Sequence, residues 1–435
     1  MRRGWGRDAF VFVALFSLWN GDGMRDLLSW WGFGALSLLL LICAVVLLVV
    51  ERARVRALLL RWDAAPLLAF GGLCLVSVAW SAYPVMTLAT CGIQIATSAV
   101  AVALLVARPT GRLVAIFGWM LHVHLLLALL FEVVVPFLPD HRLAPFFTDY
   151  GSNAPGAYYW SQGLLFTGGR IQGIAGNANL TCFIALLGAI VVGCLLAARR
   201  IGRRVAIAAL ALDLVMMALT RSATVLTAAV VVIAAIALVL GYRHTRTRGR
   251  IGLAVAATLV VALASVASSR LSEPILRVLG KGDDLTGRLE IWRVVGHLVG
   301  ERPVLGWGWI GWWAPWVAPY DRLVIRSGVE YLQAHNAFLD VELQLGVPGL
   351  LVFACLVGGT VYRALRLAVV PAPLGLLPLL LAAALLAQGI AESRLLIEGN
   401  WALLVMLALG TPWPRRAEPD EVTPEVGGVR ALAAH

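Results

Sequence analysis

The sequence has few charged residues and almost no lysine. Charged side chains make up 14% of its 435 residues, against about 25% in an ordinary soluble domain, and hydrophobic ones make up 60%, against about 45–50%. Lys281 is the only lysine, so the net charge of +11 comes almost wholly from arginine. This composition excludes a water-soluble globular protein.

Cysteine is also sparse, and its placement excludes two kinds of site. The six cysteines all fall inside apolar runs, and they contain no CxxC pair and no disulfide framework. A free thiol in such a run usually packs as a small hydrophobic side chain. We therefore expect neither a disulfide framework nor a cysteine metal pair. The cysteines are Cys43, Cys74, Cys91, Cys182, Cys194 and Cys355.

Long apolar runs dominate what is present. A helix needs about 20 apolar residues to cross a bilayer core of about 30 Å. This test predicts an all-α, polytopic membrane protein with about twelve transmembrane helices. The expected spans are 9–19, 27–50, 66–80, 85–107, 113–138, 180–198, 205–219, 223–240, 251–267, 343–365, 374–390 and 395–409.

Arginines cluster in alternate connections between these spans. Such a pattern follows the positive-inside rule, so the charge reports topology and not binding to nucleic acid. It predicts cytoplasmic N- and C-termini and places both long inserts, 139–176 and 268–334, outside. The arginines on the inner side are Arg52, Arg54, Arg56, Arg61, Arg108, Arg112, Arg199, Arg200, Arg203, Arg204, Arg243, Arg246, Arg248, Arg250, Arg363, Arg366, Arg415 and Arg416.

The chain divides into four parts on this basis. Residues 1–267 hold the N-terminal transmembrane helices and the external loop 139–176. Residues 268–334 form a large external loop, and 335–411 form the C-terminal transmembrane helices. The tail 412–435 is rich in Pro, Glu and Ala, which predicts a disordered cytoplasmic segment.

The first insert ends in a glycine-rich stretch with polar side chains. Arg170 lies between glycines, and Asn177 and Asn179 follow at the start of a span. Glycines let a backbone approach a ligand closely, and asparagine amides beside a helix N-terminus suit a phosphate or a sugar. A loop followed by a helix N-cap explains the same residues equally well.

The second insert contains an amphipathic stretch around Arg288. Leu289, Trp292, Val295 and Val299 share one helical face, which predicts a helix along the membrane surface with Arg288 at headgroup depth. The planar guanidinium fork of arginine suits a diphosphate, because it gives two parallel charge-assisted hydrogen bonds. The alternative for Arg288 is a lipid-headgroup anchor. The tryptophans from 307 to 316 predict an aromatic belt.

His335 and Asn336 stand where this insert meets the next apolar run. A histidine there titrates near neutrality and can accept a proton from a hydroxyl, as a glycosyl acceptor requires. The alternative is an ordinary hydrogen-bonded histidine at a helix start.

Taken together, these blocks resemble the Wzy/O-antigen ligase superfamily of polytopic membrane glycosyltransferases. The resemblance covers roughly residues 80–349 and rests on WSAYP at 80–84, Arg170 with GNAN at 176–179, RS at 221–222, GRLEIW at 287–292, PVLGWG at 303–308, and HN at 335–336 leading into LGVPG at 345–349.

The resemblance implies a GT-C-like fold, in which the long external insert caps a cavity on the periplasmic side of the bacterial inner membrane. The donor is then an undecaprenyl diphosphate-linked glycan, and the acceptor is a lipid or a glycan. Such a scheme requires no metal, and we expect no cofactor. Arg288 and Arg170, with Arg221, would hold the diphosphate, and His335 would be the catalytic base. The further substrate-binding residues that we expect are Asn177, Asn179, Asn336 and Trp292.

Two positions depart from the family pattern. Gln344 stands where a glutamate is frequent, and Tyr83 where an aspartate is frequent. The acceptor is therefore open: a ligase uses a lipid or glycolipid, a polymerase uses another lipid-linked glycan, and a relative uses a protein hydroxyl. A lipid-linked glycan transporter and a noncatalytic scaffold are the alternatives from other classes.

Four ionisable residues are expected within spans, where such groups are expensive and often functional: His122, His124, Glu132 and Asp213. The alternative for the histidines is packing. Arg394 and Glu398 have helical i,i+4 spacing, which predicts a salt bridge at the rim.

Overall fold

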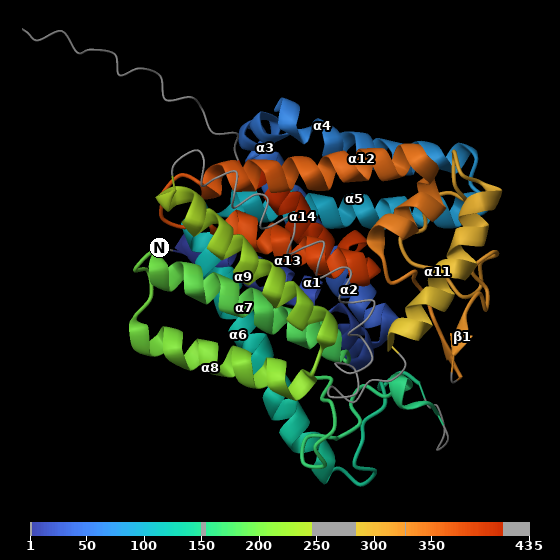
Figure 1. The fold of residues 1–435 in the computed structure, drawn as a ribbon, viewed down its shortest axis with the longest axis horizontal. Helices are drawn as coiled ribbons and strands as arrows, with labels where there is room; N and C mark the ends of the chain where they lie inside the picture. Colours follow the sequence, from blue (N-terminus) through green and yellow to red (C-terminus); the bar gives the residue numbers. More distant parts are fainter. Residues whose placement is uncertain (1, 149–153, 246–283, 327, 412–435) are drawn as a thin grey trace, which may run out of the picture.

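A computed structural model gives the structure of residues 2–148, 154–245, 284–326 and 328–411 (Figure 1). The expected span at 251–267 and the tail at 412–435 lie outside these described residues.

Long α-helices make up most of the described structure, and one short antiparallel ribbon accompanies them. The helices are α1 (Arg2–Trp19), α2 (Gly21–Val50), α3 (Arg52–Leu59), α4 (Ala65–Val76), α5 (Pro84–Ala107), α6 (Thr110–Val134), α7 (Ala178–Ala197), α8 (Arg203–Thr220), α9 (Ala223–His244), α11 (Asp284–Glu301), α12 (Ala337–Ala368), α13 (Leu377–Ala391) and α14 (Glu398–Gly410). Short 3₁₀ turns are η1 (Trp62–Ala64), η2 (Ser77–Ala79), η3 (Val135–Phe137), η4 (Gly156–Tyr158) and η5 (Ser393–Leu396). The ribbon pairs β1 (Ile325–Arg326) with β2 (Val329–Glu330).

The helices confirm a polytopic membrane protein, but not the number twelve. Seven segments of the described chain are long and apolar enough to cross a membrane, and α13 and α14 are shorter apolar helices. Helices α1 and α8 occur where spans were expected, although charged residues occupy their first turns. Helix α12 begins at Ala337, before the expected start of its span at 343, because Asn336 caps it there.

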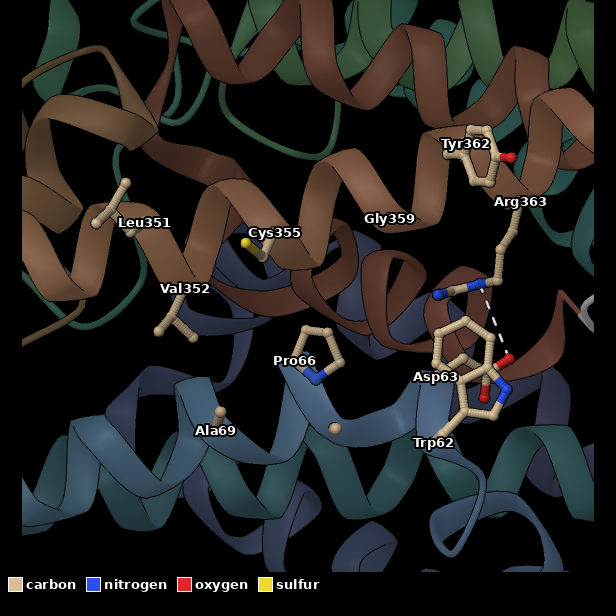
Figure 2. Close-up of a pocket in the computed structure, with 11 residues that line it drawn as sticks. Trp62, Asp63, Pro66, Ala69, Leu351, Val352, Cys355, Gly359, Tyr362 and Arg363 are labelled. Atoms are coloured by element: carbon tan, nitrogen blue, oxygen red, sulfur yellow. Dashed lines mark ion pairs between the residues drawn. The ribbon is translucent and has the colours of Figure 1, made fainter.

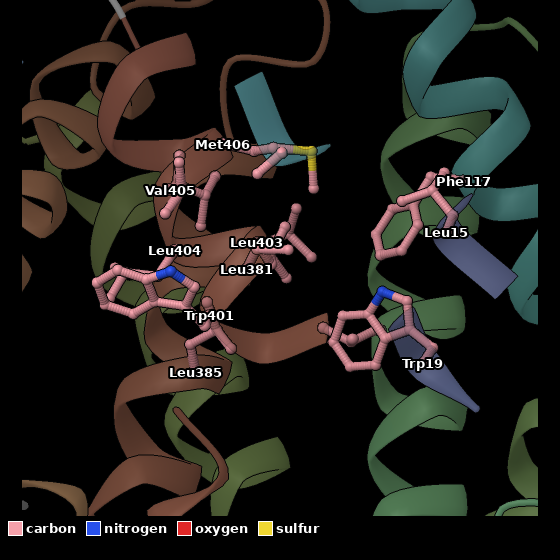
Figure 3. Close-up of a cluster of buried hydrophobic side chains, with 14 of the residues drawn as sticks. Leu15, Trp19, Phe117, Leu381, Leu385, Trp401, Leu403, Leu404, Val405 and Met406 are labelled. Carbon is pink, nitrogen blue, oxygen red and sulfur yellow. The ribbon is translucent and has the colours of Figure 1, made fainter. Parts of the chain in front are cut away.

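The centre of the bundle is a continuous apolar core built from helices distant in sequence. Trp19 of α1 lies with ring centroids 6.1 Å from Phe117 of α6 and 6.2 Å from Phe183 of α7. Figure 3 shows this cluster together with Leu385 of α13 and Trp401 of α14. All five side chains are buried, so their packing holds α1, α6, α7, α13 and α14 together.

One end of the bundle carries arginines that contact the last carbonyls of helices. Arg54 donates to the Val106 carbonyl at the end of α5, and Arg61 donates to the Leu409 carbonyl at the end of α14, each at 3.0 Å. Cations stabilise a helix C-terminus because the macrodipole is negative there. Part of the arginine excess expected on the inner side thus has a structural role.

Helix α12 is interrupted at Gly346, and the second insert fills the interruption. Gly346 has φ +64° and ψ −166°, a conformation that only glycine adopts easily. The Trp307 amide donates to the Leu343 carbonyl at 3.1 Å, and the Val347 amide donates to the Pro303 carbonyl at 3.0 Å. The loop 303–308 therefore takes over hydrogen bonds that a continuous helix would make internally.

The block at 80–84 packs on the same loop. Trp80 Nε1 donates to the Leu305 carbonyl at 2.8 Å, and the Tyr83 hydroxyl donates to the Gly308 carbonyl at 2.7 Å. Gln344 Oε1 accepts the amides of Ile310 and Gly311 at 2.9 and 2.8 Å. Both departures from the family pattern, Tyr83 and Gln344, therefore lie in this structural junction.

Helix α11 forms as expected, and most of its predicted apolar face is covered. Val295 is buried, and Trp292 and Val299 pack against the same cluster. Leu289 is the exception, because it is 57% exposed, and Ile291 is buried instead. The aromatic-belt prediction also needs correction, because Trp309 and Trp313 are fully buried and only part of the tryptophan cluster is exposed. These indoles pack α11 and the following loop onto the bundle.

Buried polar pairs account for most of the intramembrane ionisable residues. Glu132 accepts the Gln172 and Gly173 amides at 3.0 and 2.7 Å, which ties the first insert to the C-terminal end of α6. His122 Nε2 lies 3.3 Å from Asp213 Oδ2 on α8. His124 is fully buried, which agrees with the packing alternative.

The break in α12 generates a prediction about stability. A Cβ at Gly346 would lie 2.1 Å from the Val304 carbonyl oxygen, and the positive φ adds strain of about 1–3 kcal/mol. We expect Gly346→Ala to lower the thermal unfolding temperature and the folded yield in detergent.

Gly358 of the same helix is the matched control, because a Cβ there meets nothing within 4 Å. We expect Gly358→Ala to unfold at or slightly above the wild-type temperature. Equal melting of the two variants would contradict the junction described here.

Candidate functional site

Glu392 forms the centre of a polar network at one end of the bundle. It follows the last residue of α13, and its side chain is 6% exposed. His335 Nδ1 lies 2.8 Å from Oε2, and Arg288 Nη2 donates to Oε1 at 3.0 Å. Asn179 Nδ2 donates to Oε1 at 3.1 Å and Gln333 Nε2 to Oε2 at 3.2 Å. One buried carboxylate thus contacts three separate parts of the chain.

Arg170 joins this network through Asn179. Its Nη2 donates to Asn179 Oδ1, and its Nε donates to the Thr220 carbonyl at 2.7 Å. Ser222 donates from its hydroxyl to the same Asn179 oxygen at 2.8 Å. Asn179 therefore bridges a cation on one side and the Glu392 carboxylate on the other.

Arg288 and Arg221 keep capacity for a ligand. Arg288 also donates from Nη2 to Thr224 at 3.3 Å, and its side chain remains 19% exposed. Arg221 is exposed and adopts the left-handed conformation that ends α8, where its amide donates to the Met217 carbonyl at 3.2 Å. Its side chain makes no hydrogen bond or ion pair with any described residue. Its neighbours Thr220 and Ser222 both belong to the network, so the backbone of Arg221 borders the site.

His335 has an unusual backbone conformation as well as a carboxylate partner. Its φ is +53°, which is uncommon for a residue with a side chain. The Tyr331 ring packs edge-on against the imidazole, with centroids 5.6 Å apart. The histidine side chain is 18% exposed, so the imidazole is held by contacts and remains accessible.

The charge state of Glu392 follows from its partners. Burial alone raises the pKa of this carboxyl, but the His335 imidazole and the Arg288 guanidinium outweigh burial and hold the pKa below its ordinary value. The group is therefore a carboxylate at neutral pH, and it binds His335 and Arg288 as an anion.

Three helices begin at the site, and their caps include two of the expected substrate-binding residues. Asn177 Oδ1 accepts amides at the start of α7, and Asn336 Oδ1 accepts amides at the start of α12. The Ser222 hydroxyl caps α9. Helix N-termini carry a partial positive charge that favours anions. The side chains of Asn177 and Asn336 thus have the N-cap role, and the positive ends of their helices face the site.

Trp292 also has a structural contact. Its Nε1 donates to the Ala334 carbonyl at 2.9 Å, which fixes the residue before His335. Of the expected site residues, the structure brings Arg288, His335, Arg170 and Asn179 together directly, and Asn177, Asn336, Trp292 and Arg221 border them.

Two members of the polar network, Glu392 and Gln333, were not predicted from the sequence as site residues. Glu392 is an acidic residue between two apolar helices, and Gln333 lies two positions before His335. An acidic residue in an outer turn is the only local signal for Glu392. Its partners are 57 to 213 positions away in sequence, so no spacing pattern connects them.

A second polar cluster holds the segment that follows Glu392. Arg394 Nη1 donates to Glu398 Oε2 at 3.1 Å, as the i,i+4 spacing predicted. Arg394 also pairs with Asp22 of α2, and Arg25 donates to Glu398 Oε1 at 2.8 Å. The expected rim pair is therefore part of a network of four charged residues that ties η5 to the start of α2.

The comparisons with known proteins identify one domain. No curated protein matches the chain. Residues 206–354 match the family model Wzy_C, described as O-antigen ligase, over about a third of the chain. The matched stretch contains Arg221, Arg288 and His335, whereas Arg170, Asn179 and Glu392 lie outside it. Residues 206–354 are therefore similar to the O-antigen ligase family, and this match supports the Wzy/O-antigen ligase superfamily and a ligase- or polymerase-type function in O-antigen biosynthesis.

Proposed function

We propose that the protein is a glycosyltransferase of the O-antigen ligase type. It moves a glycan from a polyprenyl diphosphate donor to an acceptor hydroxyl on the periplasmic face of the inner membrane. A polymerase of the same superfamily, which uses a second lipid-linked glycan as acceptor, is the alternative.

The charge balance of the site is the observation that carries this proposal. Three arginines, Arg170, Arg221 and Arg288, lie at or beside the single carboxylate of Glu392, so positive charge predominates there. A diphosphate diester carries two negative charges, and guanidinium groups suit it. The helix N-termini of α7, α9 and α12 add partial positive charge at the same place.

The orientation of His335 suits a general base. If Nδ1 carries the proton that is donated to the Glu392 carboxylate, Nε2 has the free lone pair. Nε2 makes no hydrogen bond to any residue that the structure describes, so it can take a proton from an acceptor hydroxyl. Glu392 then fixes the tautomer and stabilises the imidazolium that forms.

The transfer can be written as a single displacement. The acceptor oxygen forms a bond to the anomeric carbon as its proton passes to His335, and the bond from that carbon to the diphosphate breaks. Negative charge grows on the departing diphosphate, so fixed arginines bind the transition state more tightly than the ground state. Attack opposite the leaving group predicts inversion at the anomeric carbon.

The first test removes the base. We expect His335→Ala to insert and fold normally but to lose transfer by about 10²–10⁴-fold, the usual contribution of general base catalysis. Transfer from a polyprenyl diphosphate glycan is measured in detergent, where no gradient exists. Wild-type transfer under these conditions also separates an enzyme from a transporter. Full activity of His335→Ala would remove the histidine from its role.

The acceptor is tested with the same wild-type preparation. A lipid or glycolipid acceptor and a second lipid-linked glycan are offered separately. We expect product with the lipid acceptor. Product with the lipid-linked glycan alone would favour the polymerase alternative.

The second test removes the charge that holds the imidazole. We expect Glu392→Gln to retain the shape of the site but to lose about 10²–10⁴-fold in turnover, because the imidazolium loses its counter-charge. The folded pKa of Glu392 is depressed, so its stabilising contribution is complete above the ordinary value of 4.5 and is lost as pH falls through the lowered pKa.

Thermal unfolding therefore provides a second measurement on this variant. The gap in unfolding temperature between the wild type and Glu392→Gln is expected at pH 7 and should close in acid. A gap that does not change with pH would show that Glu392 acts without its charge.

The third test compares two asparagines that are two positions apart. Asn179→Asp places a second carboxylate about 3 Å from Glu392, where like charges repel, and removes the donated hydrogen bond. We expect it to abolish transfer. Asn177→Asp keeps an oxygen that caps α7, so we expect near wild-type transfer. The reverse order of activities would place Asn177, and not Asn179, in the binding site.

A further inference from the structure

A groove between α4 and α12 lies at the end of the bundle opposite the polar site. Helix α12 starts beside His335, and Arg363 lies 17 residues after the break at Gly346, roughly 25 Å along a helix at 1.5 Å per residue. The groove has a volume of about 610 Å³ and extends from Leu351 and Ala69 to Arg363 and Asp63 (Figure 2). It therefore spans the half of the bundle that is remote from Glu392.

Small side chains create the apolar part of this groove. Ala69 and Pro66 of α4 face Cys355 and Gly359 of α12 across it. A Cβ at Gly359 would approach only the Arg363 guanidinium, at 3.7 Å. The two helices thus leave an apolar groove between them, which can accept a hydrocarbon chain.

Two charged residues, Asp63 and Arg363, line one end of the groove, and both are incompletely paired. Arg363 is 3% exposed; its Nη2 donates to the Ala408 carbonyl at 2.9 Å, but its Nε makes no hydrogen bond. Its nearest acid, Asp63 Oδ2, is 4.0 Å away, and Oδ1 of the same carboxylate also has no partner. Buried polar groups are normally satisfied, so an unpaired donor and acceptor side by side indicate a polar ligand.

The sign of the net charge indicates which ligand fits. Arg61 and Arg363 supply two positive charges against the single negative charge of Asp63, which leaves one positive charge. An anionic headgroup balances it. A phosphate oxygen can accept from Arg363, and a headgroup hydroxyl can donate to Asp63. The exposed indole of Trp62 and ring of Tyr362 lie at the same end, as aromatic side chains do at headgroup level.

We propose that this groove binds a phospholipid with an anionic, hydroxylated headgroup. One acyl chain lies between α4 and α12, and the phosphate lies beside Arg363 and Arg61. The arginine-rich end of the bundle is the cytoplasmic one in the proposed topology, so the lipid comes from the cytoplasmic leaflet. This site is separate from glycan transfer and does not depend on that proposal.

The test measures lipid retained by the purified full-length protein with native mass spectrometry. Phosphatidylglycerol and phosphatidylethanolamine with identical acyl chains are compared. We expect about five-fold preference for phosphatidylglycerol, the factor that corresponds to one basic residue near an anionic lipid. Equal retention of the two lipids would overturn the proposed recognition of charge.

A filled groove provides the matched comparison. Gly359→Leu projects into the groove, whereas Gly358→Leu projects from an exposed position of the same helix with open space around it. We expect Gly359→Leu to abolish the preference and Gly358→Leu to preserve it, with equal unfolding temperatures. Ala69→Leu fills the groove from α4 and guards against a folding defect of Gly359→Leu.

Two further outcomes would contradict the proposal. Retention of phosphatidylglycerol by both filled variants would place the lipid elsewhere. Displacement of the lipid from the wild type by polyprenyl phosphate, with no displacement in Gly359→Leu, would assign the groove to the isoprenoid carrier.

Discussion

The buried carboxylate of Glu392 determines how one end of the bundle is assembled. An unpaired carboxylate with 6% exposure would be strongly unfavourable, so its charge must be met by nearby donors. Those donors come from α7, from α11 and from the loop before α12, which are distant in sequence. Loss of any one donor leaves the negative charge of the buried carboxylate incompletely paired. The three segments are therefore held together by their contacts with this one carboxylate.

This arrangement also holds two arginines in place before the proposed anionic ligand binds. Arg288 uses only Nη2 toward protein acceptors, and Arg170 is fixed by a carbonyl and by Asn179. Guanidinium groups that are oriented before a ligand arrives need little reorganisation when charge develops on it. Arg221 differs, because it is exposed and lacks such contacts with the described residues. A diphosphate would order Arg221 on binding and find Arg288 already in place.

Sequence alone predicted most of the helices and named four residues that meet in the polar network, Arg170, Asn179, Arg288 and His335, but not Glu392 at its centre. The spans were readable because a bilayer demands long apolar runs. The start of α12 was placed too late because Asp340 and Gln344 make its first turns polar, and these residues are buried against the second insert. Glu392 had no periodic signal, since its contacts join residues far apart in the chain.

The sequence also did not predict which of two neighbouring asparagines belongs to the site. Asn177 and Asn179 are two positions apart, and both suit a helix start or a polar ligand. Only the structure separates them, because Asn177 accepts amides of its own helix whereas Asn179 faces Arg170 and Glu392. A side chain's direction depends on the exact cap position, which sequence patterns do not fix within a residue or two.

The junction around Gly346 reaches the site through Asp340. Asp340 accepts from Trp313 Nε1 at 2.8 Å and from the Ala334 amide at 2.9 Å, so the second insert fixes the residue before His335. The Asn336 amide donates to the Ser393 hydroxyl at 3.1 Å, which fixes the residue after it to the segment that carries Glu392. A positive φ persists only where surrounding bonds impose it. The hydrogen bonds on either side of His335 supply that constraint, and they aim the imidazole at the carboxylate.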